Sequence, residues 1–199
     1  FRYLYNLILS EYNTTAIAKI YAEPTLRNKT LYGSSINTLR VTTESISAII
    51  GGATTIATNF TSNLFSQNQQ QILNEISTFK NTQHVVTNSY YIESLTKQLA
   101  EKALTIFKDI EKSGGFLNQL KEGTIQRKIK ENAQKEEQQF ELGELVLLEV
   151  NKYPNLFNSK KDVKINPFVK RISYKTLIIP ITPKRLAEKL EQNSMRDGA

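Results

Sequence analysis

The sequence has no cysteine, no tryptophan and only one histidine, His84. Without cysteine, the chain forms no disulfide and offers no thiolate to a metal ion. A single histidine also argues against a histidine-based metal site and against a serine–histidine triad. No apolar run approaches the roughly 20 residues that span a bilayer. We therefore expect no metal site and no membrane partner.

The chain is basic, with 26 Lys and Arg against 19 Asp and Glu and a net charge of +7. Most of the excess lies in the second half, where basic and acidic side chains are mixed, as in residues 128–135. A nucleic-acid surface needs clustered basic residues with few acids among them and with interleaved aromatics. The mixed pattern favours a solvated helix face or a contact with protein, so we expect no nucleic-acid partner.

Apolar spacing in the first part of the chain predicts alternating helices and strands. Helices are predicted over residues 1–12, 36–50 and 64–79, and strands over residues 16–22, 54–58 and 84–86. The segment 16–22 is apolar on both faces, which is typical of a buried parallel strand. Such units build parallel sheets through right-handed crossovers, so an open sheet and an eight-fold barrel both fit the pattern.

The middle of the chain is mostly helical. One apolar stripe, formed by Ile92, Leu95, Leu99, Ala103, Ile106 and Ile110, predicts a long helix between Ser89 and Gly114-Gly115. Ser89 is the expected N-cap, and Gly114 and Gly115 are expected to end the helix. Shorter helices follow over residues 116–120 and 125–137, and a strand is predicted over residues 144–150.

The last part of the chain changes character after residue 159. Residues 172–181 suggest an extended segment, and Pro183 is expected in the first turn of a final helix. Residue 1 is Phe and the first helical pattern begins at once, so we expect a chain cut from a longer protein. No secretory signal pattern is present, and we expect a cytoplasmic location.

Five short pieces stand in a definite order in the second half. They are Ser89-Tyr90-Tyr91-Ile92-Glu93 with Leu95-Thr96, Gly114-Gly115, Glu122-Gly123, Lys128-Ile129 and Val150-Asn151-Lys152-Tyr153. In the first half stand Asn37, Leu39-Arg40, Glu44, Ala48, Gly51-Gly52 and Thr58-Asn59. This ordered set resembles the end of the barrel domain in the methylmalonyl-CoA mutase family, which uses adenosylcobalamin, and the likeness spans most of residues 16–153.

The resemblance implies an α/β fold made of the last β/α units of a (β/α)8 TIM barrel, followed by a helical extension. Three parts are then expected. Residues 1–88 are a partial barrel segment, residues 89–153 are the closing helix with its helical extension, and residues 154–199 are a linker towards a C-terminal domain. Because two or three strands cannot close a barrel, the missing surface is expected from the rest of the chain or from another subunit.

Departures from the family pattern bear on activity. Catalytic subunits carry A-H-x-Q-T-S-G where this chain has residues 20–26, and G-G-T-Q-S-L-H-T-N where it has residues 51–59. The glutamine and both histidines, which face the acyl-CoA and the corrin in the family, are absent. The cobalamin signature D-x-H-x-x-G is absent too. The resemblance thus implies a non-catalytic small subunit, whose partners are a catalytic large subunit and, in the complex, acyl-CoA. Adenosylcobalamin is expected in that complex and not on this fragment.

The candidate site residues fall into two groups. Glu23, Thr25 and Asn59 are candidates for the barrel mouth, with no catalytic residue expected. The structural family motif comprises Arg40, Glu44, Gly51, Gly52, Tyr90, Glu93, Gly114, Gly115, Asn151, Lys152 and Tyr153. Arg40 and Glu44 are four residues apart on one helix and are expected to pair, and Tyr90 and Tyr91 are expected at the edge of the core.

Two alternative functions remain open. The first is a catalytically competent acyl-CoA mutase relative with altered specificity. The second is a stand-alone interaction module that has inherited mutase sequence. Binding groups for phosphate and acyl chains upstream of this segment would favour the first alternative.

Overall fold

The computed structural model describes residues 1–57, 71, 73, 75, 88–154 and 176–197. Six helices and two strands have defined bounds in these residues. They are α1 (Arg2–Glu11), β1 (Tyr21–Ala22), α2 (Ser34–Ile50), β2 (Thr55–Ile56), α5 (Tyr90–Lys112), α6 (Phe116–Lys121), α7 (Thr124–Glu141) and α8 (Glu188–Asp197). The helices predicted over residues 1–12, 36–50, 116–120 and 125–137 are confirmed, as is the long helix predicted between Ser89 and Gly114-Gly115. The strand at 84–86 and nearly all of the helix at 64–79 lie outside the described residues.

β1 and β2 form a parallel pair in which Tyr21 faces Thr55 and Ala22 faces Ile56. α2 connects them, so the predicted strand–helix–strand unit is present and the fold is mixed α/β. Two strands do not make a barrel, because the interior of a barrel is filled from eight strands. The prediction of a strand buried on both faces over residues 16–22 is wrong in extent. β1 covers only Tyr21 and Ala22, and Ile17, which precedes it, is 83% exposed and is paired with no strand in the described residues.

α1 is tied to this unit by a single arginine. Arg2 donates from Nη2 to the carbonyl oxygen of Gly52 over 2.7 Å and from Nη1 to that of Ala18 over 3.3 Å. Gly52 has φ +80°, which ends α2 in the left-handed region that glycine adopts without strain. The turn after α2 therefore both reverses the chain and anchors α1.

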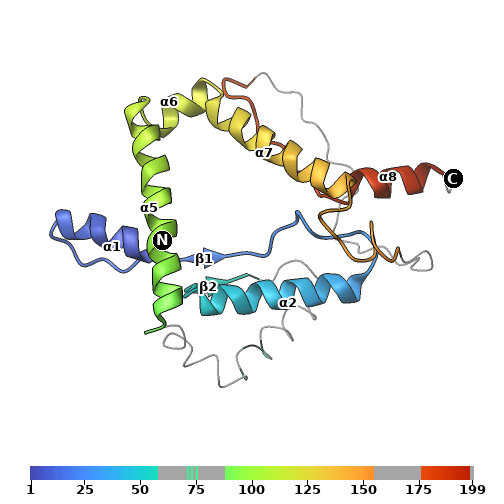
Figure 1. Cartoon of the computed structure of the whole chain (residues 1–199), viewed down its shortest axis with the longest axis horizontal. Coiled ribbons are helices and arrows are strands. Elements are labelled where there is room, and N and C mark those ends of the chain that lie inside the picture. The colour runs from blue at the N-terminus through green and yellow to red at the C-terminus, as the bar shows by residue number, and fades with distance from the viewer. Residues whose placement is uncertain (58–70, 72, 74, 76–87, 155–175, 198–199) are drawn as a thin grey trace.

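α5, α6 and α7 form an arch above β1 and α2 (Figure 1). Gly114 and Gly115, with φ of +91° and +83°, separate α5 from α6 as predicted. The Ser89 hydroxyl makes no capping hydrogen bond, contrary to the prediction. Glu93 in the first turn of α5 instead accepts from the backbone N–H of Asn88 over 3.1 Å. None of the helices in the described residues combines the length and apolarity needed to cross a bilayer.

The strand predicted over residues 144–150 is wrong. After α7 the chain makes a compact turn, residues 142–153, whose only bridge joins Leu148 and Lys152. Asn151 holds it, because Oδ1 accepts from Leu147 N–H over 2.7 Å and Nδ2 donates to the Leu145 carbonyl over 2.7 Å. Leu147 packs with Phe140, so the apolar run buries itself in a local cluster and not in a sheet.

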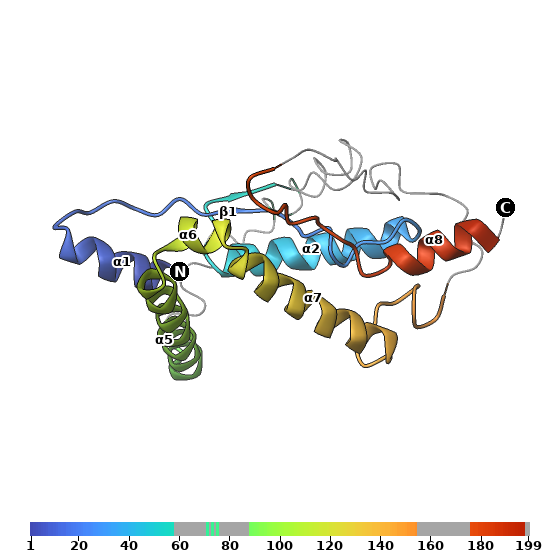
Figure 2. The same cartoon turned by 90° about the horizontal axis from the view of Figure 1, so that it is seen from above.

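The final segment also differs from its prediction. The proline prediction is wrong, because α8 begins at Glu188 and Pro183 precedes it. Of the extended segment predicted over residues 172–181, residues 172–175 lie outside the described residues, and residues 176–181 belong to neither a helix nor a strand. The residues before α8 run past α7 (Figure 1 and Figure 2), where Gln126 Nε2 donates to the Ile179 carbonyl over 3.3 Å. Ala187 is fully buried against Phe140 and Leu147, which joins the end of the described chain to the end of α7.

Candidate functional site

A small pocket opens at the carboxyl ends of β1 and β2, where parallel α/β units place their functional side chains. It has a volume of about 210 Å³ and is lined by Ala22, Glu23, Pro24, Thr25, Glu44, Ser45, Ala48 and Ile56. Two of the three residues expected at the barrel mouth, Glu23 and Thr25, thus line one pocket. Asn59 lies outside the described residues.

Glu23 and Thr25 belong to the β1–α2 loop, residues 23–33. Tyr21 donates its hydroxyl to Glu23 Oε2 over 3.4 Å. Partial desolvation raises the pKa of the Tyr21 phenol, although the side chain is 60% exposed, and the negative charge of Glu23 raises it further. The Thr25 hydroxyl oxygen accepts from the backbone N–H of Arg27 over 3.1 Å. Both lining side chains are therefore engaged by residues of the same chain.

Glu44 of the pocket lining forms an ion pair that joins α2 to the β1–α2 loop. Lys29 is completely buried and donates from Nζ to Glu44 Oε1 over 2.6 Å and to Asn28 Oδ1 over 2.6 Å. Burial lowers the pKa of the Lys29 ammonium, although the nearby Glu44 carboxylate raises it. Glu44 also accepts from Asn28 Nδ2 over 2.8 Å.

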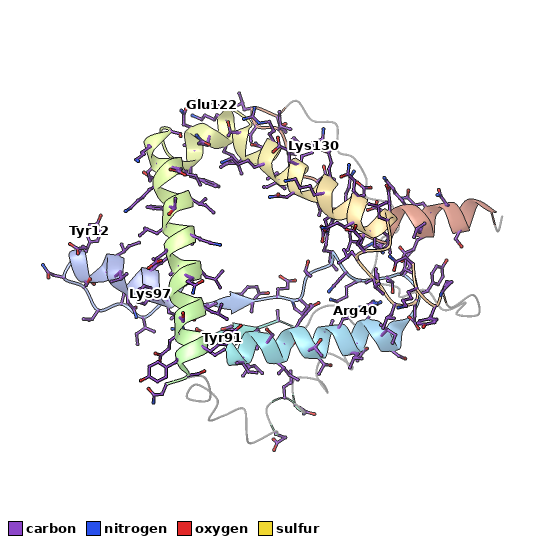
Figure 3. All side chains as sticks on the ribbon, in the orientation of Figure 1. Tyr12, Arg40, Tyr91, Lys97, Glu122 and Lys130 are labelled. Atoms are coloured by element: carbon purple, nitrogen blue, oxygen red, sulfur yellow. The ribbon has the colours of Figure 1, made fainter. Side chains whose placement is uncertain are left out.

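Arg40 does not take Glu44 as its hydrogen-bonding partner, so the predicted pair within the helix is wrong. Arg40 donates to Asn37 Oδ1 over 3.0 Å and to the Leu148 carbonyl over 3.0 Å. Figure 3 shows its side chain projecting from α2 toward the turn after α7. Burial lowers the pKa of Arg40. Lys29 takes Glu44 because the β1–α2 loop folds back over α2, which helix spacing does not reveal.

Asn37 is the hub of the loop's backbone. It is completely buried, accepts from Thr30 N–H over 3.1 Å and donates from Nδ2 to the Thr30 carbonyl over 2.6 Å. A buried amide satisfied in this way fixes the path of the loop, because each of its polar atoms would otherwise lack a partner. The loop and α2 therefore hold the pocket wall as one unit.

The remaining motif residues lie away from the pocket. The glycines end helices: Gly51 and Gly52 end α2, and Gly114 and Gly115 separate α5 from α6. Glu93 binds the backbone of Asn88, and Asn151 holds the turn at 142–153. Lys152 Nζ lies 5.7 Å from the centre of the Tyr153 ring. Tyr90 and Tyr91 are strongly exposed, contrary to the expected position at the core edge. Figure 3 shows Tyr91 at the lower end of α5.

Several charged residues of the loop and its surroundings form contacts that the sequence pattern did not predict. Arg27 binds Glu136 of α7 with Nε–Oε2 and Nη2–Oε2 distances of 2.8 and 2.5 Å. Arg185 pairs with Glu191 at 2.6 Å, and Glu191 Oε1 accepts from the backbone N–H of Leu31 over 2.7 Å. Most of these partners are more than 100 residues apart, so no local periodicity could have indicated them.

The residues of the pocket are better suited to stabilising the fold than to catalysis. Its charged lining groups are the carboxylates of Glu23 and Glu44, and the adjacent cation Lys29 is buried against Glu44. In the described part of the chain no three His, Cys, Asp or Glu residues are grouped to hold a metal ion. Pockets for drug-sized ligands occupy roughly 300–1,000 Å³, so this one does not fit a corrin ring.

Comparison with known proteins shows which family the chain resembles. Residues 1–177 match the family described as Methylmalonyl-CoA mutase. The chain is 31% identical over 169 residues to the Methylmalonyl-CoA mutase small subunit of Porphyromonas gingivalis, covering 77% of this chain and 27% of that protein. It is 31% identical over 138 residues to the Methylmalonyl-CoA mutase of Escherichia coli, covering 64% of this chain and 19% of that protein.

A third relative has a different named substrate. The 2-hydroxyisobutanoyl-CoA mutase large subunit of Aquincola tertiaricarbonis is 27% identical over 140 residues, covering 65% of this chain and 24% of that protein. The chain thus spans between about a fifth and somewhat over a quarter of the length of these curated relatives. With its family match over residues 1–177, the chain belongs to the methylmalonyl-CoA mutase family.

Proposed function

We propose that this chain is part of a methylmalonyl-CoA mutase small subunit, a non-catalytic partner that stabilises the catalytic large subunit during interconversion of methylmalonyl-CoA and succinyl-CoA. The observation that carries the proposal is the chemistry of the pocket at the strand ends. Its lining offers carboxylates where a bound acyl-CoA would need hydrogen-bond donors or cations.

The argument is electrostatic. Methylmalonyl-CoA carries a carboxylate, and like charges at close range repel most strongly where water is scarce. Glu23 and Glu44 both line the pocket, and since Lys29 balances the charge of Glu44, Glu23 supplies the net negative charge of the lining. Its two hydroxyl groups are engaged, since Thr25 accepts from Arg27 N–H and Ser45 donates to the Val41 carbonyl over 2.8 Å. The Thr25 hydroxyl keeps its own O–H, but it is a single neutral donor beside two carboxylates, whereas acyl chemistry uses several preorganised oxyanion-binding donors.

In this proposal the parallel β1–α2–β2 unit is one of the last units of a (β/α)8 barrel, and residues 154–199 lead towards a further domain. Adenosylcobalamin supplies radical chemistry when it is bound in the complex, and the large subunit would hold it. This chain's own residues serve the packing of the barrel end. The retained family residues support this role, because Asn37, Arg40 and Asn151 form contacts within the chain.

The test is to express the full-length gene product of this chain alone and together with the large subunit. Alone, with adenosylcobalamin and methylmalonyl-CoA, it should form no succinyl-CoA. Together, the two should co-elute on size exclusion, and the large subunit should melt at a higher temperature than when it is alone. Turnover by the single chain, or failure to co-elute, would contradict the proposal.

The second candidate is a catalytically competent acyl-CoA mutase relative with altered specificity. It is favoured by the identity to the E. coli protein, which equals that to the small subunit, and by the 2-hydroxyisobutanoyl-CoA relative. Turnover of 2-hydroxyisobutanoyl-CoA by the full-length chain would select it. A chain that neither turns over acyl-CoA nor co-elutes would instead fit the stand-alone interaction module.

A further inference from the structure

Residues 184–191, here called the strap, lie on the β1–α2 loop although more than 150 residues separate them in sequence. The strap includes the first residues of α8, and α8 lies beside the end of α7 (Figure 1). The strap contacts the loop, α7 and the turn at 142–153, so it joins three separate parts of the described chain.

Four hydrogen bonds fasten the strap to the loop. Arg27 and Leu186 form two of them, since Leu186 N–H donates to the Arg27 carbonyl over 3.0 Å and Arg27 Nη1 donates to the Lys184 carbonyl over 3.0 Å. Arg185 Nη1 donates to the Lys29 carbonyl over 3.2 Å. Glu191 Oε1 accepts from Leu31 N–H over 2.7 Å. The strap thus satisfies backbone groups of the loop from Arg27 to Leu31.

The central part of this attachment is buried. Arg185 and Glu191 are paired at 2.6 Å, and their side chains are only 8% and 6% exposed. Removing one partner of such a pair leaves a charge with little access to water, which is costly. Ala187 between them is fully buried with Phe140 and Leu147, so a larger side chain has no room there. The strap is therefore held by charge on one side and by packing on the other.

The loop that the strap holds also forms the pocket wall. Thr25 lines the pocket, and its hydroxyl binds the N–H of Arg27, the first residue that the strap contacts. Lys29, whose carbonyl binds Arg185, holds Glu44 in the lining through Nζ. Of the loop residues that the strap contacts, Lys29 itself holds Glu44, and Arg27 and Leu31 each lie two residues from a group that shapes the pocket.

We propose that the strap couples the C-terminal part of the chain to the pocket at the strand ends. While the strap is docked, residues Arg27 to Leu31 are held in place and the pocket keeps its shape. When the strap leaves, the pocket wall formed by Thr25 and Glu44 loosens. Movement of the segment that follows β1 is thereby linked to movement of a segment near the C-terminal end of the described chain. Coupling between distant segments travels through contiguous contacts, and the docked strap supplies such a set between the loop and the C-terminal part of the described chain.

Hydrogen exchange of single amides, followed by NMR on the whole chain, tests the coupling. Glu191→Ala removes both the acceptor for Leu31 N–H and the partner of Arg185, so exchange at Leu31 should become faster by on the order of tenfold. Faster exchange should extend to Arg27 N–H and Lys29 N–H, which donate to the Thr25 hydroxyl oxygen and the Leu26 carbonyl. Ala57 N–H, which binds the Ala22 carbonyl between the strands, should keep its protection.

Two further variants separate coupling from loss of folding. Glu191→Gln keeps an acceptor oxygen and loses the charge, so it should give a smaller effect of the same pattern. Asn193→Ala, an exposed change on the same helix, should leave all four amides unchanged. Faster exchange confined to Leu31, no change at all, or equal loss of protection at Ala57 in both Glu191 variants would each overturn the proposal.

Discussion

Lys29 is the least expected residue of the structure, because a lysine is rarely buried unless its charge is paired. It is 0% exposed, in a loop whose sequence is polar and carries no apolar period. The cost of removing its ammonium from water is offset by the contacts of Nζ with Glu44 and Asn28. The lowered pKa of Lys29 shows that the charged form is nevertheless disfavoured by burial.

Lys29→Met should lower the free energy of unfolding by about 3 kcal/mol, because it leaves Glu44 without its cation in a partly buried position. Urea denaturation followed by circular dichroism measures the change. The double variant Lys29→Met/Glu44→Leu removes both charges and should regain more than half of the loss. A single variant as stable as the wild type would mean that the pair contributes nothing to folding.

At the residue scale, the sequence predicted where a residue lies better than which residue it contacts. Glu23 and Thr25 were placed at a strand end, and both line the pocket there. The Arg40–Glu44 pair was wrong because helix spacing indicates which residues are neighbours, not which competing partner is nearer. Glu44 pairs with Lys29, which lies on a loop whose path is fixed by the buried Asn37.

At the scale of elements the helices were predictable, because their apolar stripes and terminal glycines are local features. α5 and α2 both match their predicted ranges closely. The segment 144–150 was not predictable in the same way, since a short apolar run fits a strand or a buried turn equally well. What decided it is Asn151, whose side chain holds the turn, and Ala187, which arrives from a distant part of the chain.

α7 and α8 are joined by an ion pair that should give a characteristic pH dependence. Lys189 Nζ lies 2.5 Å from Glu137 Oε1, and this contact lowers the pKa of Glu137 and raises that of Lys189. The Glu137 contribution to stability is present above its unfolded pKa of about 4.5 and is lost as the pH falls through the folded value. The Lys189 contribution is present below about 10.5 and is lost as the pH rises through the folded value.

Lys189→Ala should therefore lower the melting temperature most between about pH 5 and pH 10, with the difference from wild type shrinking on either side. The effect should be small and should weaken at 1 M salt, because Lys189 is 64% exposed. Differential scanning calorimetry across this range measures it. Lys128→Ala, an exposed change on α7, is the control, and an equal and pH-independent loss in both variants would contradict the assignment.

At the scale of the whole molecule, the described chain has little core and much exposed apolar surface. Only two small clusters of buried apolar side chains are present in the described residues, one around Val41 and one around Phe140. The stripe of α5 that was predicted to face a core is open, with Leu99 67% and Ile106 59% exposed. From the sequence we expected an uncovered sheet edge and core face, because two or three strands cannot close a barrel; the exposed stripe of α5 adds a further uncovered apolar face.

The open stripe should make the 199-residue chain associate through α5. Exposed apolar patches of this kind bind hydrophobic dyes and promote self-association. Leu99→Glu places a charge within the stripe, so it should reduce dye fluorescence and shift sedimentation towards the monomer without loss of helical circular dichroism. Thr105→Glu adds the same charge away from the stripe and should leave both unchanged. If Leu99→Glu binds as much dye and associates as strongly as wild type, the stripe of α5 is not the surface through which the chain associates.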